Sequence, residues 1–156
     1  MDRLVIGSTS HGAGKTSLIV GLGRSLAGPF AYRKPFGDRL VYRRKAARDY
    51  DAALLSEIFA LAGSPEEATL GFEHSKLRYM YDEEGTKKKL LETIVNIEKD
   101  KEILFVEGGR DLSYGISVHL DTLSLARHTG SKLFIVVSGD EDTILDDVLF
   151  LKKHVE

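Results

Sequence analysis

Three residue types that bind phosphate and magnesium stand next to one another near the start of the chain. Gly14, Lys15 and Thr16 close the stretch GSTSHGAGKT, which joins a short apolar run to a segment with an apolar stripe at helical spacing. A glycine-rich turn of this kind exposes backbone N–H groups, and a helix that starts there adds its positive end. Lysine can then reach the terminal phosphates of a nucleotide, while the threonine hydroxyl can ligate Mg²⁺. The stretch therefore predicts a phosphate-binding loop.

The match to the strict phosphate-loop pattern is incomplete. That pattern, G-x-x-x-x-G-K-[ST], puts its first glycine at position 9, where this chain has Thr9. The alternative interpretation is a glycine-rich turn between a strand and a helix, with an incidental lysine. The apolar run at residues 4–6 and the helical pattern at 17–26 favour the phosphate loop. We predict that the nucleotide is bound by Ser10, His11, Gly12, Ala13, Gly14, Lys15, Thr16 and Ser17, and that Lys15 is also catalytic.

An acidic residue follows the most strongly apolar strand in the sequence. Residues 103–106 are all apolar and are bounded by charge, which is typical of a central parallel strand covered on both faces. The strand ends in Glu107, and Gly108 and Gly109 after it allow backbone to pass close to a ligand. The alternative is a structural carboxylate. Together with Lys15 and Thr16, however, Glu107 is predicted to be catalytic and to ligate Mg²⁺.

Two more charged residues lie where a ligand would bind. Asp51 stands at the start of the helix expected at 52–62, where a carboxylate either complements the helix dipole or, if it faces the phosphate loop, holds Mg²⁺. Lys34 follows the strand expected at 30–33, at the sheet edge where ligands sit in parallel sheets. It is a candidate contact for an anionic substrate, and a solvated loop lysine is the alternative. The predicted metal ligands are Thr16, Asp51 and Glu107.

The elements that position these residues alternate between strand and helix. Strands are expected at 4–6, 30–33, 103–106 and 133–138, and helices from the phosphate loop to about Ala27 and at 52–62, 86–99, 119–129 and 143–155. This alternation predicts an α/β fold with a mainly parallel sheet. Placing the strand before Glu107 beside the strand before the loop gives the order 2-3-1-4. The basic stretch 39–48 is expected to be a solvated loop or a helix start, or else a contact for an anionic partner, and 63–85 carries no clear pattern.

Composition excludes several classes of function. The 156 residues are enough for one domain, and 42% hydrophobic with 29% charged residues is an ordinary globular composition. A net charge of −2 gives no sign of nucleic-acid or membrane binding. The absence of cysteine excludes disulfides and thiolate sites. No apolar run approaches the ~20 residues of a membrane span, and the first strand leaves no room for a signal peptide, so a cytoplasmic location is expected.

Four segments match a known family. Residues 8–16, Lys34-Pro35, residues 49–51 and residues 106–109 are similar to the dethiobiotin synthetase-like branch of P-loop NTPases, and most of all to the N-terminal domain of phosphotransacetylase-type proteins. The resemblance implies a three-layer P-loop NTPase fold, ATP and Mg²⁺ as ligands, and metal-site roles for the acids at Asp51 and Glu107. The chain departs from the family at Ser8, where the leading loop glycine belongs, and at Ser10, where the synthetases carry an acid.

The resemblance implies three alternative functions. The first is a Mg²⁺-ATP-binding P-loop domain that serves as a regulatory module or slow ATP hydrolase. The second is an ATP-dependent ligase that activates a carboxylate or carbamate of a small anionic substrate. The third is a protein-interaction module with a decayed nucleotide site, which the intact Lys15, Thr16 and Glu107 disfavour.

The resemblance also bears on what surrounds the chain. Relatives continue with further strands that build a base pocket, so residues 1–156 are expected to form a single nucleotide-binding domain truncated on its C-terminal side. The apolar strand at 133–138 would then be an edge, covered by another subunit of a homo-oligomer or by a further C-terminal region. Without a base pocket, ATP and GTP are expected to bind about equally.

Overall fold

Four parallel strands form the sheet at the centre of the molecule. The structure is a computed structural model and describes residues 1–155. The strands are β1 (Asp2–Ser8), β2 (Phe30–Arg33), β5 (Ile103–Glu107) and β6 (Lys132–Val136), in the order β2-β5-β1-β6. Each pairs in parallel with its neighbours, and Ile6 of β1 lies opposite Glu107 of β5. The predicted α/β class and the order 2-3-1-4 of these four strands are both confirmed.

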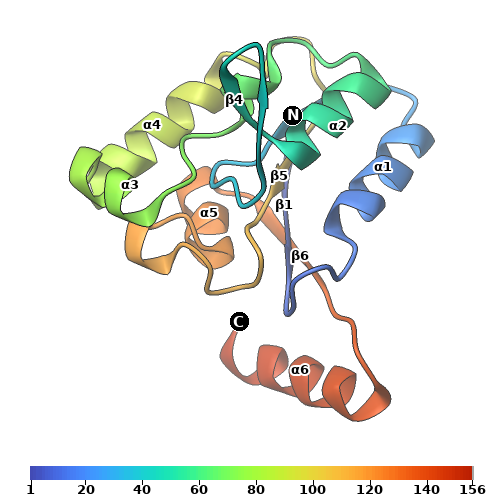
Figure 1. Cartoon of the computed structure of the whole chain (residues 1–156). Helices are drawn as coiled ribbons and strands as arrows, with labels where there is room; N and C mark the ends of the chain where they lie inside the picture. The colour runs from blue at the N-terminus through green and yellow to red at the C-terminus, as the bar shows by residue number, and fades with distance from the viewer. Residues whose placement is uncertain (156) are drawn as a thin grey trace.

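Helices cover both faces of the sheet (Figure 1). The helices α1 (Lys15–Ser25) and α2 (Tyr50–Phe59) lie on one face, and α3 (His74–Met80), α4 (Glu83–Val95) and α5 (Thr122–Thr129) lie on the other. Side chains alternate along β5, so Leu104 and Val106 enter the core beneath α4 and α5, whereas Phe105 enters the core beneath α1 and α2. Glu107 comes two residues after Phe105 and therefore faces α1.

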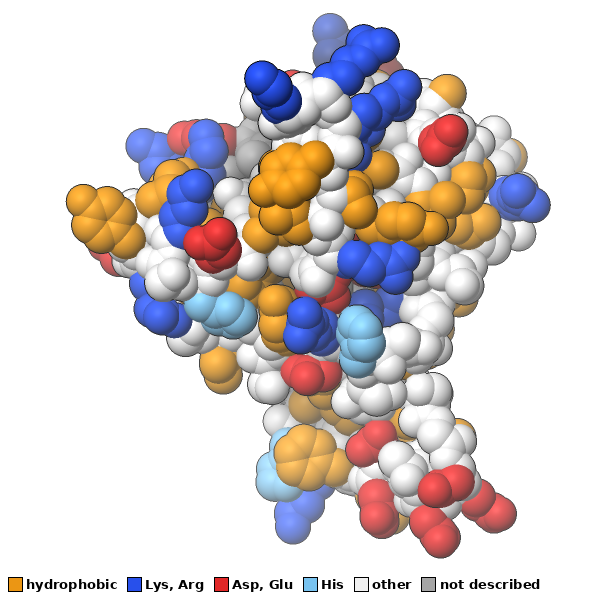
Figure 2. All heavy atoms as spheres, viewed as in Figure 1, with side chains coloured by type: hydrophobic (Ala, Val, Ile, Leu, Met, Phe, Trp, Pro, Cys, Tyr) orange, Lys and Arg blue, Asp and Glu red, His pale blue; other side chains and the backbone are white. Residues whose placement is uncertain are grey.

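The basic stretch at 39–48 is a β-hairpin, so the expectation of a solvated loop or helix start was wrong. Its antiparallel strands are β3 (Leu40–Arg43) and β4 (Ala46–Asp49). The two turn residues, Arg44 and Lys45, adopt φ values of 50° and 67°. Two-residue hairpin turns of this kind usually use glycine or asparagine, which this chain lacks at both positions, so the sequence carried no turn signal. The hairpin's exposed basic side chains form the cluster at the top of Figure 2.

The segment that carried no clear pattern is ordered as two short helical pieces. A 3₁₀ turn, η1 (Pro65–Ala68), precedes α3, and Gly71 between them forms a single parallel bridge with Phe36. Several helix ends differ from expectation by a few residues. The first helix ends at Ser25, and α2 ends at Phe59 because the next residue, Ala60, has a φ of 48°. A second 3₁₀ turn, η2 (Ile116–Val118), precedes α5.

The last strand and helix are packed differently from the rest. β6 is the edge strand of the sheet, with Phe134 46% exposed. The chain then leaves the sheet, and α6 (Glu141–His154) stands apart from the other helices (Figure 1). None of the described residues of α6 is buried, although Leu145, Leu149 and Phe150 are all apolar and each more than half exposed. Among the described residues, no helix combines the length and apolarity that crossing a membrane requires.

Candidate functional site

The loop between β1 and α1 has the backbone geometry of an anion cradle. Gly12 and Gly14 adopt φ values of 75° and 104°, which other residues rarely tolerate. Helix α1 starts at Lys15 without a side chain that caps its first N–H groups and without an acidic residue in its first turn. These N–H groups, together with the positive end of the helix dipole, face a pocket of about 480 Å³. An anion in this pocket would supply the missing hydrogen-bond acceptors.

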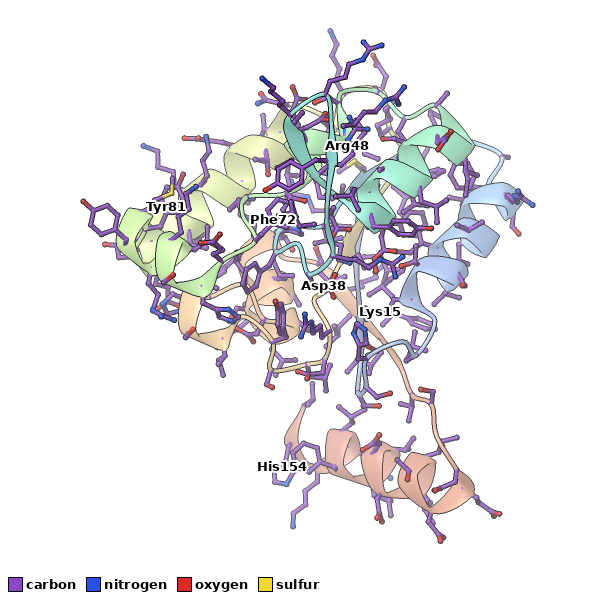
Figure 3. The ribbon with its side chains drawn as sticks, viewed as in Figure 1. Lys15, Asp38, Arg48, Phe72, Tyr81 and His154 are labelled. Atoms are coloured by element: carbon purple, nitrogen blue, oxygen red, sulfur yellow. The ribbon has the colours of Figure 1, made fainter. Side chains whose placement is uncertain are left out.

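The Lys15 side chain folds back over the phosphate loop that precedes it. Its Nζ donates a hydrogen bond to Ser8 Oγ at 2.9 Å, and the residue is only 7% exposed. Burial lowers the pKa of Lys15, and the nearby Glu107 carboxylate opposes this effect. Figure 3 shows Lys15 and Asp38 close together in the view, and both line the pocket. The ammonium therefore already faces the space that a phosphate group would fill.

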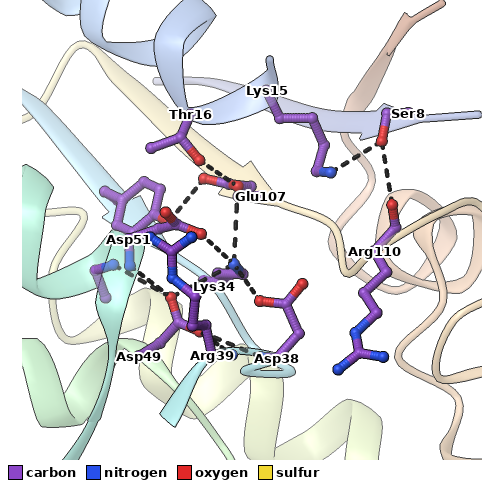
Figure 4. Close-up of polar contacts among 12 residues, drawn as sticks. Ser8, Lys15, Thr16, Lys34, Asp38, Arg39, Asp49, Asp51, Glu107 and Arg110 are labelled. Carbon is purple, nitrogen blue, oxygen red and sulfur yellow. Dashed lines mark hydrogen bonds and ion pairs between the residues drawn. The ribbon is translucent and has the colours of Figure 1, made fainter. Parts of the chain in front are cut away.

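Glu107 is held between two hydroxyl groups. Thr16 Oγ1 donates to its Oε1 at 2.8 Å, and the Tyr32 hydroxyl donates to its Oε2 at 2.8 Å (Figure 4). Glu107 is 1% exposed, and this burial raises its pKa to about 7, against the lowering effects of the Lys34 ammonium and the two hydrogen bonds. The side chains meet because β2 and β5 pair in register and Tyr32 faces the α1 side, as Glu107 does.

Lys34 lies at the centre of an acidic cluster. Its Nζ contacts Asp51 at 2.6 Å, Asp38 at 2.7 Å, Asp49 at 3.4 Å and Glu107 at 3.9 Å. Burial alone would lower the pKa of Lys34, but the surrounding carboxylates raise it above its ordinary value. Lys34 is therefore a charged, 1% exposed residue rather than a solvated loop lysine. Its contacts with protein carboxylates occupy its ammonium group in this state.

Asp49 organises the backbone around this cluster. Its Oδ1 accepts from the backbone N–H groups of Asp51 and Ala52 and so caps α2, while its Oδ2 accepts from those of Asp38 and Arg39, each at 3.2 Å. The side chain is fully buried. One carboxylate thus ties the loop after β2 to the start of α2 and fixes the positions of two acids near Lys34.

Most of the residues predicted from the sequence line one pocket. They are His11, Gly12, Ala13, Gly14, Lys15, Thr16, Ser17, Lys34, Asp51 and Glu107. Ser10 does not line it, and its hydroxyl contacts that of Ser138 at 3.1 Å. The sequence reasoning missed Asp38, Arg39 and Arg110, which also line the pocket, and Tyr32, which holds Glu107. Asp38 carried no signal of its own, whereas Arg39 belongs to the basic stretch 39–48, for which contact with an anionic partner was the alternative interpretation. Arg110 directly follows Gly108-Gly109, and the close backbone approach to a ligand that these glycines allow was the one sequence signal for Arg110.

The oxygen donors in the pocket suit a magnesium ion. Thr16, Asp51 and Glu107 offer a hydroxyl and two carboxylates, the hard ligands that Mg²⁺ prefers. Asp38, Asp49 and Asp51 form a second set, whose carboxylate oxygens lie within 4.8 Å of one another. An ammonium, that of Lys34, already lies among these acids, so the site favours positive charge. The fit is therefore good, and Asp51, whose Oδ2 contacts Lys34, could bind a metal through its Oδ1.

A comparison with protein-family models agrees with this geometry. The model for an AAA domain (AAA_26) matches residues 2–155, which is nearly the whole chain. That family comprises P-loop NTPases related to dethiobiotin synthetase. The uncapped start of α1, the Lys15 amine and the Thr16–Glu107 pair are the parts of a nucleotide site that such a fold requires. The chain therefore belongs to the AAA_26 family and is a nucleotide-binding P-loop domain.

Proposed function

We propose that this chain binds ATP with Mg²⁺ in the pocket between α1 and the ends of β2 and β5, and hydrolyses it slowly. The observation that carries the proposal is the hydrogen bond between Thr16 Oγ1 and Glu107 Oε1, at 2.8 Å. It joins the predicted metal-binding hydroxyl to the predicted metal-binding carboxylate, directly beside the lysine of the loop. Mg²⁺, when bound here, would neutralise charge on the phosphates.

The protein groups have separate roles in this proposal. The backbone N–H groups of Gly14 and the first turn of α1 cradle the phosphates. Lys15 leaves Ser8 and moves to the terminal phosphates, where its charge opposes the negative charge that develops during phosphoryl transfer. Thr16, Asp51 and Glu107 orient the metal, and Tyr32 holds Glu107 in place.

The arrangement of the acids favours slow hydrolysis. Asp38 and Asp51 contact Lys34, and Glu107 accepts from Thr16 and Tyr32. Both oxygens of Glu107 and one oxygen each of Asp38 and Asp51 are thus engaged, so no carboxylate of the pocket is wholly free to activate an attacking water. A regulatory nucleotide site fits this arrangement. Ligase chemistry, in which the phosphoryl group passes to a carboxylate or carbamate, is the second candidate. It is favoured by the two arginines at the pocket mouth.

Calorimetry tests the proposed site. Lys15→Ala should lower ATP affinity in the presence of Mg²⁺ by about 10- to 100-fold, because it removes a charge-assisted contact of roughly 1.5–3 kcal/mol. Lys88→Ala, at an exposed position on α4, is the matched control and should leave the affinity unchanged. Omitting Mg²⁺ should weaken binding to the wild type. Wild-type ATP affinity in a folded Lys15→Ala variant would refute the proposal.

A further inference from the structure

We propose that Arg39 and Arg110 form a second anion subsite at the mouth of the phosphate pocket, which takes the carboxylate or phosphate group of a second ligand. The proposal rests on the proposed function, because it assigns the base of the pocket to the triphosphate and Mg²⁺. It concerns a different set of residues from those that cradle the nucleotide. Both arginines line the pocket, and both are exposed.

The other cations of the pocket are already engaged. The Lys34 ammonium is shared among Asp38, Asp49 and Asp51, and the Lys15 ammonium lies on Ser8 at the loop. In contrast, neither Arg39 nor Arg110 has a carboxylate within 4.0 Å among the residues that the structure describes. Together with the Lys15 ammonium, which contacts only the neutral Ser8 hydroxyl, the two guanidinium groups are therefore the positive charges of this pocket that have no carboxylate partner.

Arg39 is held in place without an acidic partner. Its guanidinium carbon lies 3.7 Å from the centre of the Tyr50 ring, a close cation–π contact. Its backbone N–H donates to Asp49 Oδ2, and its carbonyl accepts from the Tyr50 N–H at 2.9 Å. Both ends of the residue are thus anchored, while the edge of the guanidinium remains available for an oxyanion.

Arg110 is supported in a similar way from the other side of the pocket. Its carbonyl accepts from Ser8 Oγ at 3.4 Å, and its guanidinium carbon lies 5.3 Å from the centre of the Tyr114 ring. Tyr114 in turn stacks on the buried Phe36 at a ring separation of 5.0 Å. Gly109 makes this approach possible, because a Cβ there would lie 2.3 Å from Tyr114 Cδ1. The loop after β5 is therefore shaped to present Arg110 over an aromatic ring.

The topology brings both arginines from the β5 and β2 side of the sheet edge, next to the phosphate loop that follows β1. Arg110 comes from the loop after β5, and Arg39 from the segment after β2, the neighbouring strand. The nucleotide phosphates would lie on the start of α1, on the β1 side of β5. A second ligand that enters between the two arginines would thus bring its anionic group toward the end of the phosphate chain. Guanidinium groups bind carboxylate and phosphate through paired hydrogen bonds, which suits such a ligand.

Arginine side-chain NMR tests the subsite on the full chain loaded with Mg²⁺ and a non-hydrolysable ATP analogue, so that the terminal phosphate position is filled. Succinate and methylphosphonate are titrated separately at constant ionic strength. We expect saturable shifts of the Arg39 and Arg110 Nε–H signals, with one dissociation constant for both signals in each titration. Tighter binding of one probe identifies the carboxylate or the phosphate as the preferred group.

Three variants sharpen the result. Arg39→Gln and Arg110→Gln should each weaken probe binding about tenfold, and Tyr50→Leu about threefold. Arg43→Gln, on the exposed hairpin, is the matched control and should have no effect. Unsaturable shifts, or equal shifts at Arg43, would overturn the subsite. So would a tenfold loss of nucleotide affinity in the arginine variants with probe binding unchanged, because the arginines would then belong to the nucleotide site.

A failure of the proposed nucleotide binding can be distinguished from a failure of the arginine subsite. If the wild type binds no nucleotide analogue, the same titrations are made on the free protein. Saturable shifts at both arginines would then support the subsite although the nucleotide assignment had failed. Their absence there would refute the subsite as well.

Discussion

The β2–β5 side of the sheet and the β6–α6 region differ in which side chains they bury. Beside β2 and β5, Lys34 and Glu107 are each 1% exposed and satisfied by close partners, whereas at β6 and α6 the apolar Phe134 and Leu149 are 46% and 55% exposed. Burying paired charges does little for stability, so a cluster of this kind suggests a binding function. An apolar surface exposed over a strand and a helix indicates contact with another surface. Coverage of the β6 edge by another subunit or by a further C-terminal region stays a prediction.

The largest expected effect contrasts one leucine in each region. Leu90 of α4 is fully buried, so Leu90→Ala should lower the free energy of unfolding by about 2–5 kcal/mol, through lost burial and the cavity that remains. Leu149→Ala on α6 should change it by less than about 0.5 kcal/mol. Urea denaturation measures both. A loss above 2 kcal/mol for Leu149→Ala would show that α6 is packed against a partner in solution, and the two regions would then not differ in burial.

The next prediction concerns the pH dependence of metal binding. The pKa of Glu107 is raised to about 7, and only its ionised form binds Mg²⁺ well. The Mg²⁺-dependent part of nucleotide affinity should therefore fall as the pH drops below about 7, approaching tenfold per pH unit. Calorimetry from about pH 5 to pH 8 measures it. The same dependence in Glu107→Gln would mean that another group titrates.

The same pKa shift has a consequence for folding. The folded state holds the Glu107 proton more tightly than the unfolded state, where the pKa is near its ordinary 4.5. This group therefore contributes stability below that value, and the contribution is lost as the pH rises through about 7. The melting temperature of Glu107→Gln relative to the wild type should accordingly increase from about pH 5 to pH 8. A constant difference would contradict the raised pKa.

A smaller effect is expected from the support of Glu107. Tyr32→Phe removes one hydroxyl that donates to the carboxylate and lowers its pKa, so the pKa of Glu107 should rise further. A typical hydrogen bond contributes about 0.5–1.5 kcal/mol, so Mg²⁺-dependent affinity at pH 7 should fall by about two- to tenfold. Tyr79→Phe, at a 93% exposed position, is the control. Equal behaviour of the two variants would remove Tyr32 from the site.

The smallest expected difference is between nucleotides. The pocket is lined by the phosphate loop and by charged side chains, and no Phe, Tyr or Trp lines it among the described residues. Phosphate and Mg²⁺ contacts should therefore dominate, and ATP and GTP affinities should agree within about threefold. Competition calorimetry compares them. A tenfold preference for ATP, about 1.4 kcal/mol, would reveal a base pocket within these residues.

The sequence by itself determined the fold class and most of the phosphate site, because these depend on local pattern. Apolar runs such as residues 103–106 predict buried strands, and Gly14, Lys15 and Thr16 between a strand and a helix predict an anion cradle whatever packs around them. Parallel strands also bring their carboxyl ends to one edge, which is why Lys34 and Glu107 could be named before their contacts were known. Asp51 could be named because a carboxylate suits a helix start.

Only the tertiary structure decided how the charges pair. Local pattern carries no information on which of several acids Lys34 will contact, since Asp38 is a neighbour in sequence but Glu107 arrives from another strand. The Tyr32–Glu107 bond depends on strand register, and the hairpin depends on two left-handed residues that are neither glycine nor asparagine. Arg39 and Arg110 lie about 70 residues apart in the sequence and line one pocket because they follow neighbouring parallel strands, and each packs on a ring close to it in the chain, Tyr50 or Tyr114.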